Sequence, residues 1–265
     1  MSTKGPGPDS SQIGGAFPAS GPTHPADLVA IAGIYLVPWG KREMTLVGAG
    51  TVLLAAVVVL LAARLGVFWL LALVPILAVG GWGLLFFRNP RRTVPQEPGL
   101  FVAPADGRIT DVGRVKETEY IGGPAWKVGI FLSVFNVHLN RAPCTGRVDF
   151  LRHRNGKYLD ARNPASAREN ESQAIGILRA DRGGPQGKRV LVHAISGAIA
   201  RRIVCPLQTG QALERGGIIG MIKFGSRTEL FVAEDPANPL EILVKIGDAV
   251  KAGQTVICRY GSTGL

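Results

Sequence analysis

Cysteine and charge are both scarce in this chain of 265 residues. The three cysteines, Cys144, Cys205 and Cys258, form no CxxC pair, which excludes a disulfide scaffold and argues against a cysteine-based zinc site. We interpret them as ordinary thiols in a reducing compartment. Only 18% of the residues are charged, although 46% are hydrophobic, and this combination indicates that the apolar residues are concentrated in one part of the chain.

Acidic residues are the scarcer of the two charged classes. The chain has 19 Asp and Glu against 30 Lys and Arg, a net charge of +11, which favours a polyanionic partner, either nucleic acid or an anionic membrane surface. The second half of the chain has no basic tract with interleaved aromatic residues, so anionic lipid is favoured over nucleic acid. The four histidines form no close pair or triplet, and we therefore expect no metal site.

Two long uncharged runs follow a leader of small residues. Residues 1–30 are rich in Gly, Pro, Ser and Ala; this composition predicts disorder and lacks the features of a signal peptide. Residues 31–92 form the predicted membrane segment. Within it, residues 44–63 and 65–87 carry no charge, and each run is long enough to cross a bilayer core of about 30 Å.

The flanks of the membrane segment are basic on both outer sides. The residues concerned are Lys41 and Arg42 before it and Arg88, Arg91 and Arg92 after it. The positive-inside rule therefore predicts that both ends lie in the cytoplasm, joined by a tight turn near Arg64 and Gly66. Because Arg64 would then lie on the far side, a re-entrant or leaflet-embedded hairpin stays open as an alternative. We expect a cell-membrane protein whose following domain faces the cytoplasm.

Residues 93–265 have a different pattern, in which Gly and Pro separate short runs rich in Val, Ile and Phe. This spacing is typical of a β-rich domain. Three of the runs, 127–132, 190–195 and 241–246, are predicted strands, the polar stretch 161–173 is predicted to be a long loop, and 247–253 a turn. The fold class predicted for the whole chain is a mostly β (α+β) domain preceded by a two-helix transmembrane hairpin.

Few residues of this domain could carry chemistry. Asp106 lies in Ala-Pro-Ala-Asp-Gly, which alone indicates only a turn. Asn136, His138 and Asn140 are spaced by two, so on a strand they would share one face. Burying three polar groups together is costly, which favours a wet pocket around His138. The dipeptide Gly225-Ser226 is a common turn, here held between two short apolar runs.

Taken together, these pieces resemble the phosphatidylserine decarboxylase family in its shorter bacterial and archaeal form. The matching segments are Phe87–Pro90, Ala103–Gly107, Phe135–Pro143, Glu169–Glu171 and Phe224–Arg227. They occur in the family's order within residues 85–257, and their combination is far more specific than any one of them.

The resemblance implies a pyruvoyl enzyme that makes its own cofactor. Ser226 would attack the carbonyl of Gly225, cut the chain between residues 225 and 226, and become a covalent pyruvoyl group. That group would form a Schiff base with the serine amine of the lipid and act as an electron sink when CO2 leaves. His138, oriented by Asp106, would be the base and the proton donor. Chains 1–225 and 226–265 would then form a heterodimer, with a higher oligomer also open.

Two departures from longer family members bear on these roles. Those members have a second histidine three positions after the first, used in self-cleavage, where this chain has Arg141, which stays protonated. Either His138 serves both steps or the base lies elsewhere. The triplet Gly261-Ser262-Thr263 copies the cleavage site of the longer members, but cutting there would leave four residues, and we interpret it as coincidence.

The substrate and the enzyme class leave alternatives. Basic residues would suit the lipid phosphate, and Asn140, Arg141 and Arg202 are the candidates for binding substrate. The lipid would be phosphatidylserine, converted to phosphatidylethanolamine; an ether-linked analogue such as archaetidylserine, or another amine lipid, is an alternative. A non-enzymatic, membrane-anchored lipoyl-like module is the alternative of a different class.

Overall fold

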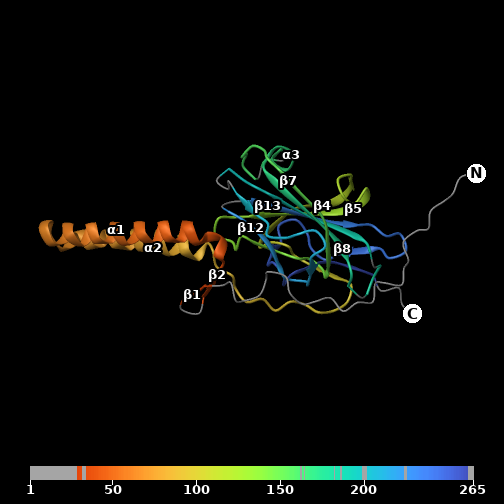
Figure 1. Cartoon of the computed structure of the whole chain (residues 1–265), viewed down its shortest axis with the longest axis horizontal. Coiled ribbons are helices and arrows are strands. Elements are labelled where there is room, and N and C mark those ends of the chain that lie inside the picture. Colours follow the sequence, from red (N-terminus) through yellow and green to blue (C-terminus); the bar gives the residue numbers. More distant parts are fainter. Residues whose placement is uncertain are drawn as a thin grey trace, which may run out of the picture.

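The computed structural model describes residues 29–31, 34–161, 163, 165–181, 183–185, 187–198, 202–223 and 226–261. The predicted disordered leader at 1–30 lies outside these ranges, except for Val29 and Ala30, which open strand β1 (Val29–Ile31). The chain consists of a long helical hairpin that projects from one end of a β domain (Figure 1). This arrangement confirms the predicted fold class.

The hairpin begins after β2 (Ile34–Leu36) and a short 3-10 turn, η3 (Pro38–Gly40). Helix α1 (Lys41–Leu65) ends at Gly66, whose φ of 117° favours glycine. The return arm is a 3-10 segment, η4 (Val67–Ala72), followed by α2 (Leu73–Leu85). The two arms, Pro38–Leu65 and Val67–Leu85, are each long and apolar enough to cross a membrane. The turn is where the sequence predicted it.

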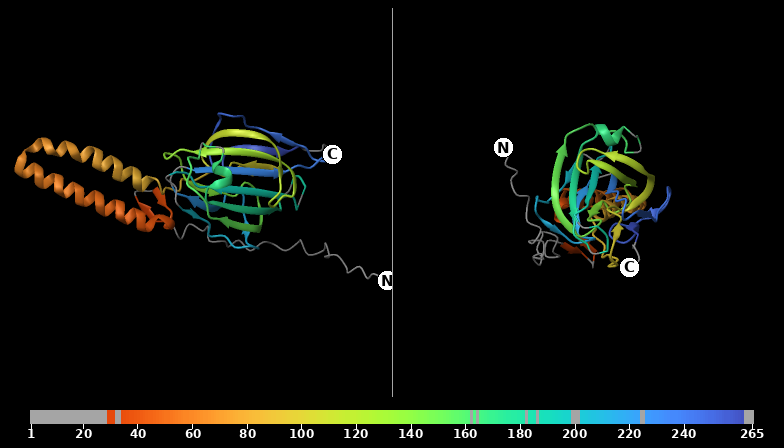
Figure 2. Two further views of the ribbon diagram at one scale, coloured as in Figure 1. Left: turned by 90° about the horizontal axis from the view of Figure 1, so that it is seen from above. Right: turned by 90° about the vertical axis from the view of Figure 1, so that its right-hand side faces the viewer.

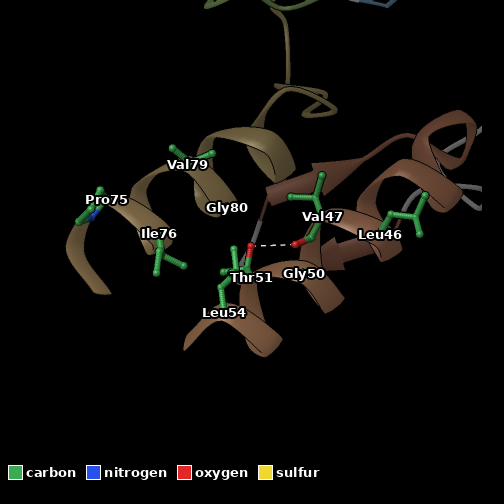
Figure 3. Close-up of a pocket in the computed structure, with 9 residues that line it drawn as sticks. All are labelled: Leu46, Val47, Gly50, Thr51, Leu54, Pro75, Ile76, Val79 and Gly80. Atoms are coloured by element: carbon green, nitrogen blue, oxygen red, sulfur yellow. Dashed lines mark hydrogen bonds between the residues drawn. The ribbon is translucent and has the colours of Figure 1, made fainter. Parts of the chain in front are cut away.

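The two arms pack closely at their small residues. A Cβ added to Gly80 would collide with the side chain of Thr51, whose hydroxyl donates a hydrogen bond to the Val47 carbonyl (2.7 Å). Small residues at such crossings let helix backbones approach one another in membranes. Beside this crossing lies an apolar groove between the arms, drawn in Figure 3. Most other side chains of the arms are exposed to their surroundings.

The β domain is built around an eight-stranded antiparallel sheet in the order β11-β7-β8-β9-β13-β5-β4-β15. In chain order these strands are β4 (Gly107–Glu117), β5 (Gly123–Leu132), β7 (Gly146–Arg154), β8 (Ser172–Arg179), β9 (Arg189–Ile195), β11 (Ala212–Leu213), β13 (Ser226–Ala233) and β15 (Ala249–Val250). The sheet curves strongly, so that its strands wrap round the interior (Figure 2).

Two three-stranded sheets complete the domain. One has the order β10-β12-β6 and contains β10 (Ile203–Val204), β12 (Ile218–Ile222) and β6 (Leu139–Arg141). The other has the order β14-β16-β3 and contains β14 (Leu240–Ile242), β16 (Val256–Tyr260) and β3 (Leu100–Val102). The main core is apolar and lies inside the curved sheet, with Val128, Ile130, Leu230 and Val232 among its members. Because strand residues alternate between faces, Ser226 and Thr228 point to the same side as Leu230.

Three local predictions need correction. The stretch 161–173 is not one loop, because it contains helix α3 (Ser166–Glu169) and the start of β8. The strand expected at 241–246 ends at Ile242. The strand expected to carry Asn136, His138 and Asn140 on one face is limited to 139–141, because residues before it form a turn in which the Asn136 side chain accepts the Ser133 N–H (2.9 Å).

Candidate functional site

Ser226 is the first residue of β13 and is fully buried. It pairs with Leu132 of β5 on one side, and on the other side Arg227 pairs with Ile195 of β9. Its hydroxyl has no hydrogen-bond partner among the described residues. A buried hydroxyl without a partner is costly to keep, so its presence points to a chemical role. Phe224 and Gly225 lie outside the described residues, and the predicted cleavage position is described on its Ser226 side alone.

Two more buried oxygen atoms near the start of β13 lack partners among the described residues. One is the hydroxyl of Ser196, the residue that directly follows Ile195 and therefore the neighbour of Ser226 across the sheet. The other is Oδ1 of Asn140, whose Nδ2 donates to the Thr228 hydroxyl (2.8 Å). Thr228 is two residues from Ser226 on the same face of β13. The interior at this end of the sheet is therefore lined by polar oxygen atoms that have no hydrogen-bond partners among the described residues.

His138 immediately precedes β6, and its backbone carbonyl accepts the N–H of Ile222, the last residue of β12. Only three residues separate Ile222 from Ser226 in the sequence. His138 is therefore bound to a residue that lies only a few positions before the serine. The ring Nδ1 lies 3.0 Å from the carbonyl oxygen of Asn136. A carbonyl only accepts, so Nδ1 carries the proton and Nε2 is the basic nitrogen.

The imidazole is buried against the end of the hairpin. Its ring centroid lies 4.3 Å from that of Phe86, with a tilt of 35°. Burial lowers the pKa of His138 to about 4; the hydrogen bond to the Asn136 carbonyl opposes this shift and the positive charge of Arg88 adds to it. The ring is therefore neutral at physiological pH, which a general base requires. The pocket expected around His138 is not open to solvent, because His138 and Asn140 are both buried.

Asp106 is engaged by groups other than His138. Its carboxylate accepts two bonds from the Arg92 guanidinium (2.8 and 3.0 Å) and one from the N–H of Ala252 (2.7 Å). The following residue is necessarily glycine, because a Cβ on Gly107 would collide with the Phe131 carbonyl. The contacts described for Asp106 thus hold the segment after the hairpin to the β domain, and the predicted pairing with His138 is not among them.

Arg141 is likewise turned toward the protein's own acceptors. Its guanidinium donates to the Gly216 carbonyl (2.7 Å) and to Oδ1 of Asn89 (2.5 Å). Burial, together with the nearby charge of Arg92, lowers its pKa, while Asp106 opposes this, but a guanidinium remains protonated at neutral pH. These contacts fit a structural role, in which Arg141 connects β6 to the segment after the hairpin, better than a role in binding the substrate.

Arg202 differs from Arg141 in being exposed. Its carbonyl accepts the N–H of Lys223 (3.1 Å). Lys223 is buried, and its ammonium lies 2.5 Å from the carboxylate of Glu43 in the first turn of α1. The exposed guanidinium of Arg202 therefore belongs to the end of the domain where the hairpin joins, close to the residues that precede Ser226.

The segment Glu169–Glu171 supports the site from the side. The Asn170 amide donates to the carbonyls of Leu159 (2.8 Å) and Ser196 (2.7 Å), and the Ser196 N–H donates to the Glu171 carbonyl (2.9 Å). These bonds fix the strand end next to Ser226. The contacts of Glu169–Glu171 therefore give this segment a structural role.

Sequence reasoning missed Phe86, Glu43, Lys223 and Ser196. Two of them had a signal: Glu43 is the one acidic residue between positions 31 and 92, and Lys223 interrupts an apolar run just before Gly225. A buried charge at such a position needs a partner. Phe86 gave no signal, because one aromatic at the end of an apolar helix is unremarkable in a sequence.

Comparison with known proteins identifies the relatives of this chain. The model of the phosphatidylserine decarboxylase family matches residues 81–258. A protein of Rhodopirellula baltica is 43% identical over 212 residues, 80% of this chain and 85% of its own length. A protein of Carboxydothermus hydrogenoformans is 44% identical over 192 residues, which are 72% of this chain and 85% of that protein. A protein of Symbiobacterium thermophilum is 40% identical over 218 residues, which are 82% of this chain and 97% of that protein. All three are named phosphatidylserine decarboxylase proenzyme.

These matches show that the chain is an enzyme of the carboxy-lyase class. It belongs to the phosphatidylserine decarboxylase family, as the resemblance indicated. The alternative of a non-enzymatic lipoyl-like module is therefore set aside. Among the described residues no group of His, Cys, Asp and Glu is arranged to hold a metal ion.

Proposed function

We propose that this chain decarboxylates phosphatidylserine to phosphatidylethanolamine with a pyruvoyl group that it makes from Ser226. The observation that carries the proposal is the buried Ser226 hydroxyl, which has no hydrogen-bond partner among the described residues, at the start of a central strand. In a family whose members are named proenzymes, a serine held in this way is a reacting group rather than a packing residue.

Self-cleavage begins with the Ser226 hydroxyl attacking the carbonyl carbon of Gly225. The peptide C–N bond breaks as the new C–O bond forms, leaving an ester and a free amine on Ser226. Removal of the Ser226 α-proton expels the Gly225 carboxylate and leaves a dehydroalanine. Water then replaces the nitrogen, which departs as ammonia, and the pyruvoyl group remains at the start of chain 226–265.

His138 is the base in this proposal. A serine hydroxyl is a weak nucleophile at neutral pH and needs a neighbouring group to take its proton. Nε2 of the neutral imidazole is that group, since Nδ1 is bound to the Asn136 carbonyl. With Arg141 unable to take a proton, His138 serves in self-cleavage and again as the donor that returns a proton to the substrate carbon. Asp106 has its role in holding the segment after the hairpin.

The residues around Ser226 fit the pyruvoyl group. When present, that group supplies an electron sink for the electrons left behind by CO2. Asn140 and Ser196 offer polar side chains beside it whose oxygen atoms have no partner among the described residues. Their place on the interior face excludes bulk water, which strengthens hydrogen bonds to a reacting group.

The two chains produced by cleavage would stay together as a heterodimer. The shorter chain, 226–265, contains β13, which pairs with β5 along its whole length and with β9 from Arg227 to Val232. It also contains β16, which pairs with β3. Strands of the two chains therefore share sheets, and no unpaired edge is created in the centre of the large sheet.

The substrate would reach the site from the membrane. The hairpin carries Trp82 near its domain end, and Trp82 lies edge-on to Phe135, whose side chain is exposed. Tryptophan and other aromatics favour the membrane–water boundary. Arg88 donates to the Phe135 carbonyl (2.7 Å), and the exposed Arg202 lies at the same end. The cations next to the hairpin support a location of the domain on the cytoplasmic leaflet, where anionic lipids are abundant.

Ser226→Ala tests the proposal. The variant should remain a single chain and should release no CO2 from phosphatidylserine in mixed micelles, whereas the wild-type chain should give two bands and activity. Thr145→Ala, which removes a partly buried hydroxyl next to β7 at the other end of the large sheet from Ser226, is the matched control and should still be cut. Cleavage of Ser226→Ala at the same position would refute the assignment. Offering diacyl and ether-linked lipids to the wild type in parallel identifies the preferred lipid tail.

A further inference from the structure

The hairpin does more than adjoin the β domain, because its last residues enter the site. Phe86 follows α2 directly and is 1% exposed. It belongs to a cluster of buried apolar residues from the hairpin, β6 and β12, which comprises Val37, Phe86, Phe87, Val137, Leu139, Ile218 and Met221. Within this cluster the Phe86 ring lies against the His138 ring at 4.3 Å.

We propose that the membrane hairpin is a structural part of the catalytic site, in which Phe86 is the positioning residue that holds the His138 ring. The inference rests on the role proposed above for His138. On one side the ring is held by the bond between Nδ1 and the Asn136 carbonyl (3.0 Å), and on another by the Phe86 ring. Two such constraints fix both the tautomer and the tilt of an imidazole.

Phe86 also contributes to the burial of the ring. Burial is the largest cause of the low pKa of His138, and the positive charge of Arg88 adds to it. Arg88 donates hydrogen bonds to the carbonyls of Leu85 and Phe135. Removing the aromatic ring of Phe86 would admit water and raise the pKa toward its ordinary value, so His138 would take up a proton in mildly acidic solution.

The other arm of the hairpin contacts the segment that precedes Ser226. Glu43, in the first turn of α1, forms an ion pair with Lys223, two residues before Gly225. The Lys223 side chain is 7% exposed, and a buried ammonium that loses its partner destabilises the folded protein. The hairpin therefore holds Lys223, two residues before Gly225, as well as the proposed base.

Phe87 provides a matched control for Phe86. It is equally buried, belongs to the same cluster and packs edge-on against Phe86 with 5.2 Å between ring centroids. Its ring packs on Gly40, where an added Cβ would collide with it. Leucine at either position removes a similar amount of aromatic packing, but Phe86→Leu alone removes the ring described against His138.

The experiment follows self-cleavage of full-length chains made by cell-free synthesis into detergent micelles, where membrane anchoring plays no part. The cut fraction is measured over time between pH 3 and pH 8. We expect Phe86→Leu to slow cleavage about tenfold and to move the acidic midpoint of the rate upward from about 4 toward 6.5. Phe87→Leu should leave that midpoint unchanged. Equal midpoints for wild type and Phe86→Leu, or equal shifts in the two variants, would overturn the role of Phe86.

A second variant keeps the test decisive if Phe86→Leu does not fold. Glu43→Gln changes a half-exposed carboxylate and should slow cleavage several-fold without moving the midpoint; cleavage at the wild-type rate would show that the hairpin does not support the site. If the wild type is not cut and resembles Ser226→Ala, the proposed function itself fails. If the wild type is cut and the two hairpin variants match it, this inference alone fails.

Discussion

The imidazole of His138 is neutral in the folded protein because the surrounding side chains exclude water from it. In the unfolded chain the same group has an ordinary pKa near 6.5, whereas in the folded state it is about 4. Between these values the unfolded state binds more protons than the folded state, so the free energy of unfolding falls as the pH falls. Above pH 6.5 the imidazole is neutral in both states, so this loss of stability is absent.

This difference predicts a pH dependence that belongs to one residue. From pH 7 to pH 5 the wild type should lose about 2 kcal/mol of stability through His138. The thermal midpoint in detergent should therefore fall more steeply with pH in the wild type than in His138→Gln. The carboxylate of Glu229, whose pKa is about 2, titrates below this window in both proteins. Parallel pH profiles of the two proteins would contradict the low pKa.

Arg202 is the predicted site residue best placed to meet a lipid phosphate. Its replacement in Arg202→Gln should raise KM for the lipid about tenfold and leave kcat unchanged, because a charge-assisted hydrogen bond contributes roughly 1.5 kcal/mol. The control is Lys116→Gln. Lys116 is an exposed cation on β4 that lies opposite Pro124, toward the end of β5 that is far from Leu132. Assays of decarboxylation in mixed micelles measure both constants. An unchanged KM in Arg202→Gln, or an equal rise in the control, would exclude this role.

At the scale of elements, the proposed cleavage position lies where cutting the chain would not open the fold. Strand β13 begins at Ser226, the residue that would follow the cut, and is hydrogen-bonded on both sides. We therefore predict that chains 1–225 and 226–265 copurify in detergent without any covalent link. Affinity capture through a tag on the longer chain should retain the shorter one until denaturant is added. Release of the shorter chain in detergent alone would contradict this arrangement.

Periodicity and composition predicted the elements well and their ends less well. The uncharged runs gave both arms of the hairpin and its turn at Gly66, because length and apolarity alone define such helices. Strands β5 and β9 were predicted from their runs of Val and Ile. The strand through His138 was misjudged, because the Asn136 side chain closes a turn with Ser133 and a spacing of two cannot distinguish a strand from a turn.

The motifs named candidate site residues, but they did not predict the contacts that these residues make. The motifs indicated Ser226, His138 and Asp106, yet they carry no information about which partner each side chain meets. Asp106 meets Arg92, and Arg141 meets Asn89, since the segment after the hairpin folds back over the domain. That long-range packing also brings Phe86 to His138, and it depends on residues too far apart in the chain for a local pattern to reveal.

At the scale of the whole molecule, the hairpin and the neighbouring cations Arg88 and Arg202 lie at one end of the domain (Figure 1). Hydrophobic insertion differs from electrostatic adsorption in its response to salt and alkali. We predict that the protein stays in the membrane pellet after washes with high salt and with alkaline carbonate, and that only detergent releases it. Release by salt would mean that the hairpin does not enter the bilayer.

Formation of a pyruvoyl group from Ser226 is the central claim, and the intact mass of the purified protein under denaturing conditions tests it most directly. The account predicts two chains that divide between residues 225 and 226. The shorter chain, residues 226–265, should be lighter than its sequence by the mass of one ammonia, because the serine nitrogen is lost. Two chains that divide elsewhere, or one uncut chain in a preparation that decarboxylates phosphatidylserine, would contradict it.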